Sequence, residues 1–176
     1  GEVHYDRGPA HSEIIWFEVP ESLAGFLSVS GNPWLACLLP LAGTMGERLR
    51  LSVPLDKSLH QGAMELMHIW EGWYPQLRAI PIEADVLGPV PNTSAPKRAM
   101  TFFSGGIDSF FTALRYEAES GSRIDDLVKA LGMDIPLQNA QTFQRLRTRL
   151  QKAADEWGKN LIDVSTNLRE TRFRET

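Results

Sequence analysis

The sequence predicts an α/β protein in which a parallel, doubly wound sheet, here incomplete, is preceded by a small α+β domain. Three observations lead to this prediction. Residues 88–96 are rich in proline, glycine and small polar residues, a composition typical of a linker. After this linker, short apolar runs alternate with helical patterns, as in parallel sheets. Before it, the pattern is mixed. We therefore expect two domains, 1–94 and 95–176.

The first domain is expected to contain short strands and two helices. Asn32 and Pro33 are typical of the first positions of a helix, and Pro40 is expected to end or kink that helix early. Another helix is expected from Asp56, where apolar residues recur at helical spacing. The role of this domain stays open. The strands are expected at 14–19, 26–29, 49–53 and 79–84.

The second domain is expected to begin with a strand over 99–103, followed at once by a glycine turn and a helix. A second strand over 124–131, an amphipathic helix over 143–157 and a third strand over 161–165 come next. Three strands are half of a doubly wound sheet, so we expect further residues downstream of the sequence given. The apolar face expected for the first helix consists of Ile107, Phe111, Leu114 and Ala118.

Composition limits the function classes. The 176 residues are 43% apolar and 23% charged, as in ordinary globular proteins, and no apolar run approaches the ~20 residues of a membrane helix. The single cysteine, Cys37, allows neither an intrachain disulfide nor a cysteine-cluster zinc site within this sequence. A formal net charge of −4 disfavours non-specific binding of nucleic acid. We expect a cytoplasmic protein with a small-molecule substrate and no membrane partner, and a homodimer stays open.

The hexapeptide Ser-Gly-Gly-Ile-Asp-Ser at 104–109 is the strongest functional signal. Adjacent glycines allow positive φ angles and expose amides that bind anions, and the start of a helix adds its unpaired amides and dipole. Asp108 would repel phosphate, so we expect it to hold Mg²⁺. The alternative is an ordinary capped glycine turn. The sequence contains neither the Walker pattern nor G-x-G-x-x-G. The residues expected to bind ATP phosphates are Ser104, Gly105, Gly106, Ile107 and Ser109.

Polar residues follow the second and third predicted strands, where ligands bind in parallel sheets. Asp134 follows the second strand, and Thr166, Asn167 and Arg169 follow the third. We consider these four residues candidate contacts to the nucleotide or substrate, with Arg169 suited to clamp a phosphate or carboxylate. Their alternative is a solvated surface turn. A basic run on the amphipathic helix is expected to be a solvated face, with nucleic-acid contact as the alternative. It consists of Arg145, Arg147, Arg149 and Lys152.

The hexapeptide and its position after a strand resemble the N-type ATP pyrophosphatases, the PP-loop superfamily. These include GMP synthetase, asparagine synthetase, NAD synthetase and 7-cyano-7-deazaguanine synthase. Over roughly residues 97–170, and especially at 131–136 and 166–169, the sequence is most similar to uncharacterised bacterial relatives of the deazaguanine synthase. Two features depart from the family. Phe110 stands where a small residue is more usual, and the zinc-binding cysteine cluster of the deazaguanine synthases is not present in this sequence.

The resemblance implies an adenine nucleotide alpha hydrolase-like fold that uses ATP and Mg²⁺. In this family, the loop binds the β,γ-pyrophosphate of ATP, and a substrate carboxylate or carbonyl oxygen attacks the α-phosphorus. Pyrophosphate leaves, and a nucleophile, commonly ammonia, displaces AMP. We therefore expect a C–N bond-forming ligase, with no catalytic residue identified, and expect the isolated fragment to be inactive. The alternatives are a non-catalytic nucleotide-binding or regulatory module and an enzyme that modifies tRNA or nucleobases.

Overall fold

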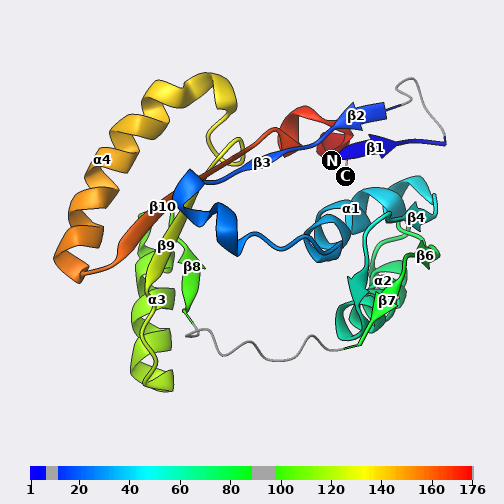
Figure 1. The fold of residues 1–176 in the computed structure, drawn as a ribbon, viewed down its shortest axis with the longest axis horizontal. Helices are drawn as coiled ribbons and strands as arrows, with labels where there is room; N and C mark the ends of the chain where they lie inside the picture. Colours follow the sequence, from blue (N-terminus) through cyan, green and yellow to red (C-terminus); the bar gives the residue numbers. More distant parts are fainter. Residues whose placement is uncertain (7–11, 89–97, 176) are drawn as a thin grey trace. The chain divides into compact units, whose positions relative to one another are not determined.

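The computed structural model describes residues 1–6, 12–88 and 98–175, and they form two compact units (Figure 1). The first unit contains the described residues of Gly1–Val3, Ser12–Phe26 and Ala95–Thr171. The second contains the described residues of His4–His11, Leu27–Ser94 and Arg172–Thr176. This interleaved division differs from the expected domains 1–94 and 95–176, because residues near the start of the chain supply a strand to the sheet formed near its end.

The first unit is built on a four-stranded sheet with the order β3-β10-β9-β8. β8 (Met100–Phe102), β9 (Asp126–Leu131) and β10 (Asn160–Thr166) are parallel to one another and correspond to the three strands predicted after the linker. β3 (Phe17–Glu18) pairs antiparallel with the end of β10. The mixed α/β prediction with parallel strands is confirmed for this unit.

Both helices of the first unit pack on the same face of this sheet. α3 (Ile107–Ser120) connects β8 to β9, and α4 (Ala140–Trp157) connects β9 to β10 (Figure 1). One core cluster joins residues of the strands to residues of both helices, which places the helices on one face. The buried members of this cluster are Phe103, Ala113, Ile124, Leu127, Leu150 and Ala154.

The helix predicted after the glycine turn is confirmed, but the face expected to be apolar does not turn toward the core. Ile107, Phe111 and Leu114 are 84%, 60% and 53% exposed. The core-facing residues are instead Ala113 and Phe110, whose ring packs edge-on against Phe103 with the ring centroids 4.8 Å apart. The aromatic residue at position 110 therefore fixes which face of α3 is buried.

β8 is an edge strand of the sheet among the described residues, and two of its three side chains are apolar and exposed. Met100 and Phe102 are 64% and 76% exposed. The remaining elements of this region are short. They are the pair β1 (Glu2–His4) and β2 (Ser12–Ile14) and the 3₁₀ turns η1 (Glu21–Phe26), η2 (Leu137–Asn139) and η3 (Leu168–Glu170).

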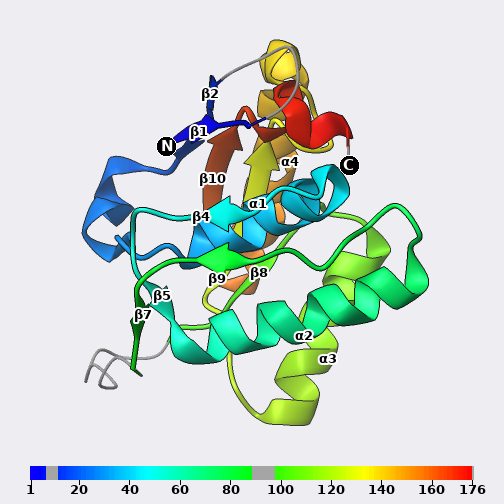
Figure 2. The same ribbon diagram turned by 90° about the vertical axis from the view of Figure 1, so that its right-hand side faces the viewer.

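The second unit combines two helices with two short parallel strand pairs. Figure 2 shows β4 (Leu49–Arg50) with β6 (Ile82–Glu83) and β5 (Leu55–Asp56) with β7 (Val86–Leu87), beside α1 (Asn32–Met45) and α2 (Lys57–Trp73). The turn η4 (Arg172–Glu175) packs against α1. The helix predicted from Asp56 is confirmed as α2. Asp56 caps it, because its carboxylate accepts hydrogen bonds from the amides of Ser58 and Leu59.

Two expectations for this region differ from the structure. The helix does not end at Pro40, which lies inside α1, and it continues to Met45 because the residues around the proline are buried against the unit's core. The alternative, a kink at Pro40, stays a prediction. The strand expected at 26–29 is not formed. Phe26 and Val29 are 84% and 91% exposed, and apolar residues without a neighbouring strand do not form one. Among the described residues, the search for a helix long and apolar enough to cross a membrane found none.

Candidate functional site

The candidate site begins where β8 leaves the sheet. Phe103 is 1% exposed, and its amide donates to the carbonyl of Val128 on β9 at 2.8 Å. The next residues leave the core at once, and Ser104, Gly106, Ile107 and Asp108 are all exposed. α3 then begins at Ile107. The predicted loop is therefore a short exposed turn held between a buried strand end and a helix start.

Hydrogen bonds inside the loop fix its shape. Ser109 Oγ donates to the carbonyl of Gly106 at 2.8 Å, and Ser104 Oγ lies 3.4 Å from Ser109 Oγ. The amide of Gly106 donates to Ser104 Oγ at 3.2 Å. The two serines thus close the turn across the glycines. Because the Gly106 amide already has an acceptor, a ligand at this position would have to displace the Ser104 hydroxyl.

The loop offers other amides to an anion. Gly105 has a φ of +79°, a value that glycine adopts without strain. Ile107 and Asp108 are the first residues of α3, where an α-helix provides no intrahelical acceptor for the amides. Gly106, the N-cap, provides no side chain to satisfy them. The exposed amides and the positive end of the helix dipole together can bind a phosphate group.

Asp108 lies in the first turn of α3 and is exposed. Among the residues that the structure describes, no group of three or more His, Cys, Asp or Glu side chains is arranged to hold a metal. A single carboxylate is nevertheless compatible with Mg²⁺, which proteins often bind through one or two carboxylates, waters and the phosphates of a substrate. Asp108 is therefore compatible with a metal that arrives with a nucleotide.

Two of the four strand-end candidates fasten the fold. Thr166 is 2% exposed, and its hydroxyl donates to the carbonyl of Trp16 at 2.8 Å. The side chain of Asn167 accepts from the amide of Trp16 at 3.0 Å and donates to the carbonyl of Ile14 at 2.8 Å. These bonds attach the early segment of the chain to the end of β10. Because both polar groups of Asn167 and the hydroxyl of Thr166 are engaged, we leave both residues out of the proposed binding surface.

The other two candidates, Asp134 and Arg169, are exposed and lie on adjacent turns. Arg169 Nη1 donates to the carbonyl of Met133, the residue before Asp134, at 3.3 Å. Gly132 brings these turns together, because a Cβ on this glycine would overlap the carbonyl oxygen of Thr166. Asp134 and Arg169 therefore remain candidate ligand contacts at the carboxyl ends of β9 and β10.

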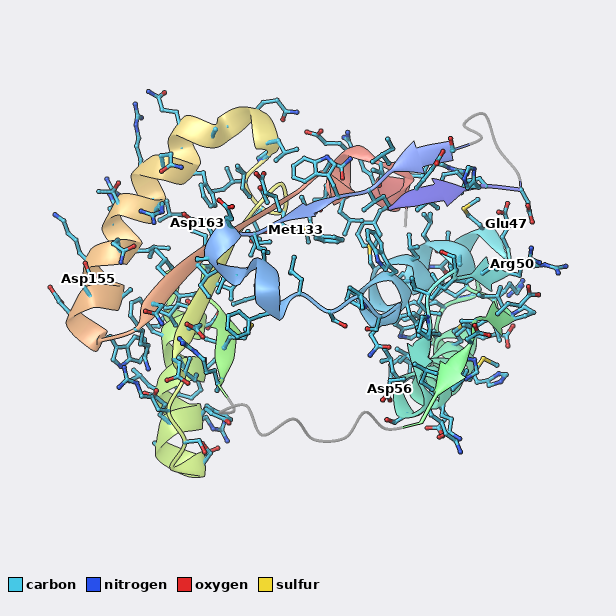
Figure 3. All side chains as sticks on the ribbon, in the orientation of Figure 1. Glu47, Arg50, Asp56, Met133, Asp155 and Asp163 are labelled. Atoms are coloured by element: carbon cyan, nitrogen blue, oxygen red, sulfur yellow. The ribbon has the colours of Figure 1, made fainter. Side chains whose placement is uncertain are left out.

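A charged cluster around the buried Lys129 lies between the sheet and α4, and sequence reasoning missed it. Lys129 of β9 is 5% exposed, pairs in register with Asp163 of β10, and lies over the ring of Phe143 at 5.0 Å. Arg147 Nε donates to Asp163 Oδ2 (Asp163 is labelled in Figure 3). Burial lowers the pKa of Lys129, an effect opposed by the charges of Asp163 and Asp134. The signal in the sequence was a lysine among the apolar residues of 127–131.

The basic run on α4 divides in two. Arg147 is partly buried by its ion pair with Asp163, whereas Arg145, Arg149 and Lys152 are exposed. The exposed three lie four and three residues apart and therefore share one helical face. This arrangement agrees with a solvated face, and contact with nucleic acid stays a prediction.

The fold and the loop geometry can be compared with known proteins. A scan against protein-family models, a search of curated proteins and a search of solved structures each found no match to this chain.

Proposed function

We propose that the loop at 104–109 binds the polyphosphate of ATP, and that the protein is an ATP-dependent adenylating enzyme of the ligase type. The observation that supports this proposal is the exposed turn between β8 and α3, with Gly105 at positive φ and the first amides of the helix unpaired by the helix itself. Parallel α/β sheets bind ligands at the carboxyl ends of their strands, and the loop occupies that position. We also propose that the three parallel strands are part of a complete doubly wound sheet.

In the proposed reaction, a carboxylate or carbonyl oxygen of a small substrate attacks the α-phosphorus of ATP. The bond from that phosphorus to the bridging oxygen breaks, and pyrophosphate leaves with the electron pair. Ammonia then displaces AMP from the adenylate. The amides of Gly105, Ile107 and Asp108 would stabilise the charge that develops on the leaving pyrophosphate. The hydroxyls of Ser104 and Ser109 would orient it, and Arg169 would hold a substrate carboxylate or phosphate.

ATP normally arrives with Mg²⁺, which would neutralise charge between its phosphate oxygens. Asp108 would hold this ion; its exposed position in the first turn of α3, beside the loop amides, supports this role.

Calorimetric titration of the chain with Mg²⁺–ATP and with pyrophosphate tests the binding step. Ser109→Ala should weaken binding roughly tenfold or more, the loss typical of one hydrogen bond to a charged group. Ser120→Ala is the matched control, because it removes a hydroxyl from the other end of α3, where Ser120 Oγ donates to the carbonyl of Tyr116. If the unmodified chain binds neither ligand, the loop is a capped turn and the proposal is wrong.

A non-catalytic nucleotide-binding module is the second candidate. It is favoured by one observation: among the described residues, none of the ion pairs or side-chain hydrogen bonds brings a lysine or arginine to the loop. Release of pyrophosphate by the full-length protein, measured with candidate carboxylic acids and ammonia, separates the two functions. Binding of ATP without release under any substrate favours the module, and substrate-dependent release favours the enzyme.

A further inference from the structure

The proposed phosphate loop lies directly against α4 at one point. A Cβ added to Gly105 would overlap Cδ2 of Leu150. Leu150 is 6% exposed and belongs to the same core cluster as Phe103, the last buried residue before the loop. At Gly105 the loop backbone therefore lies against the Leu150 side chain, which comes from a helix about 45 residues later in the sequence.

The position of Leu150 is set by the sheet and does not depend on the loop. One turn before it, Arg147 is ion-paired with Asp163 of β10, and one turn after it, Ala154 is fully buried. These residues share the sheet-facing side of α4 with Leu150. Because closely packed interiors leave little space for adjustment, α4 holds Leu150 at a fixed height above the strands.

We propose that Leu150 is a positioning residue for the phosphate loop. It supports the backbone at Gly105 and so determines the direction of the amides from Gly105 to Asp108. The inference rests on the proposed function of the loop. Several amides that bind one anion must point to a common centre, and a misplacement of about 1 Å can cost on the order of 100-fold in function. Without the leucine side chain, the loop backbone could move toward α4, and its amides would no longer point to a common centre.

Position 105 requires glycine for two independent reasons, and the contact with Leu150 is one of them. Its φ of +79° disfavours any side chain, and Leu150 fills the space that a Cβ would occupy. Gly121 is the natural comparison, because it has a φ of +64° and open space where its Cβ would be. The two glycines therefore separate the backbone effect from the contact with Leu150.

The first experiment measures binding of inorganic pyrophosphate to the 176-residue chain by calorimetry, at a temperature where all variants are folded. We expect Leu150→Ala to weaken binding by roughly tenfold or more, as for other displaced binding groups. Leu150→Met should restore most of the affinity, because methionine fills similar volume. Ile124→Ala is the matched control. It removes a buried side chain from the same cluster at the amino end of β9, and binding should stay within about twofold.

The second experiment tests the contact itself through thermal unfolding of single and double variants. Gly105→Ala should lower the midpoint more than Gly121→Ala does. In a Leu150→Ala background, the two substitutions should lower it by similar amounts, because the overlap is gone and the backbone effect remains. If Gly105→Ala is equally harmful in both backgrounds, Leu150 does not support the loop.

The outcomes distinguish this inference from the proposed function. If the unmodified chain binds no pyrophosphate, the proposed function is wrong and the positioning role falls with it. If the unmodified chain binds and Leu150→Ala binds equally well, or no worse than Ile124→Ala, the loop retains its function and only the positioning role is overturned.

Discussion

The amino ends of the three parallel strands carry ion pairs between different elements, whereas the carboxyl end of β8 carries an exposed turn whose polar groups bond mainly to one another. At the amino ends, Arg98 forms two hydrogen bonds with the carboxylate of Asp126, at 3.0 and 2.6 Å, and Asn160 donates a third at 2.9 Å. Close by, Lys159 Nζ donates to Glu117 at 2.5 Å and to the carbonyl of Ile124 at 2.7 Å. These charged groups bond mainly to one another.

At the carboxyl end of β8, the polar groups bond mainly within one turn, and Ser104, Gly106 and Asp108 are exposed. The amino ends of the strands are therefore held by ion pairs between different elements, whereas the turn after β8 is held by hydrogen bonds within itself. The end of β10 is fastened separately, by Thr166 and Asn167. A binding loop must keep hydrogen-bond donors free for its ligand, so the loop contributes little to the stability of the fold. Other regions have to supply that stability. If this is correct, substitutions at the two ends should separate stability from binding.

The largest expected effect is at Lys159, whose side chain is 2% exposed. Lys159→Met removes the cation from a buried pair and leaves Glu117 and the carbonyl of Ile124 without it. We expect a loss of about 3 kcal/mol in the free energy of unfolding, measured by urea denaturation. The control Lys152→Met changes an exposed lysine of α4 and should alter stability by less than about 0.5 kcal/mol. If Lys159→Met and Lys152→Met destabilise the fold equally, the buried Lys159–Glu117 pair does not hold the amino ends of the strands.

The next largest expected loss of stability is at Gly132, at the carboxyl end of β9. Gly132 has a φ of +89°, and a Cβ there would overlap the carbonyl oxygen of Thr166. Gly132→Ala should therefore cost about 2 kcal/mol or more, because both the backbone and the neighbouring strand end must shift. Gly121→Ala, with open space at its Cβ, should cost about 1 kcal/mol. Similar urea midpoints for the two variants would show that the turns can separate freely.

The third effect concerns pH. The hydrogen bond from Lys159, and then that from the amide of Ile124, lower the pKa of Glu117. A carboxyl with a lowered folded-state pKa stabilises the fold above its unfolded pKa of about 4.3. That stabilisation is lost as the pH falls through the folded-state value. The stability advantage of the unmodified chain over Glu117→Gln should therefore be full near about pH 6 and shrink toward about pH 3.

Urea denaturation across this pH range is the measurement for Glu117. Glu119→Gln, which removes a carboxylate from an exposed pair with Arg115 on the same helix, should follow the unmodified chain closely. An advantage over Glu117→Gln that does not change with pH would show that the Glu117–Lys159 pair contributes no stability.

The order of elements around the loop could be predicted because it is local in the sequence. An apolar run followed at once by glycines and then by helical spacing predicts β8, the loop and α3, and all three are confirmed as structure. The pairing of β3 with β10 could not be predicted. Glu18 lies opposite Ser165, and a two-residue strand carries no pattern that identifies a partner so far along the chain.

The candidate site was predictable in part for the same reason. The loop residues are consecutive, whereas its support comes from Leu150, which the sequence marked only as one apolar position in a helix stripe. The sequence indicates Thr166 and Asn167 as ligand contacts because they follow the strand predicted at 161–165. Such positions also suit fastening, and their hydrogen bonds to residues 14 and 16 are long-range contacts that no local pattern reveals.

The smallest expected effect on stability, and the sharpest on binding, is at Asp108. Asp108→Asn removes a negative charge from the first turn of α3, which should cost roughly 0.5 kcal/mol or less without ligand. Its effect on binding should change sign with Mg²⁺. Without the ion, the carboxylate repels an anion, so Asp108→Asn should bind pyrophosphate more tightly. With the ion, the variant would lose the proposed metal ligand, so it should bind Mg²⁺–ATP more weakly. Calorimetry with and without Mg²⁺, and with Glu119→Gln as the control at the far end of α3, measures both. A capped turn without a ligand predicts no effect of Mg²⁺ at all, so the reversal separates a nucleotide loop from a structural one.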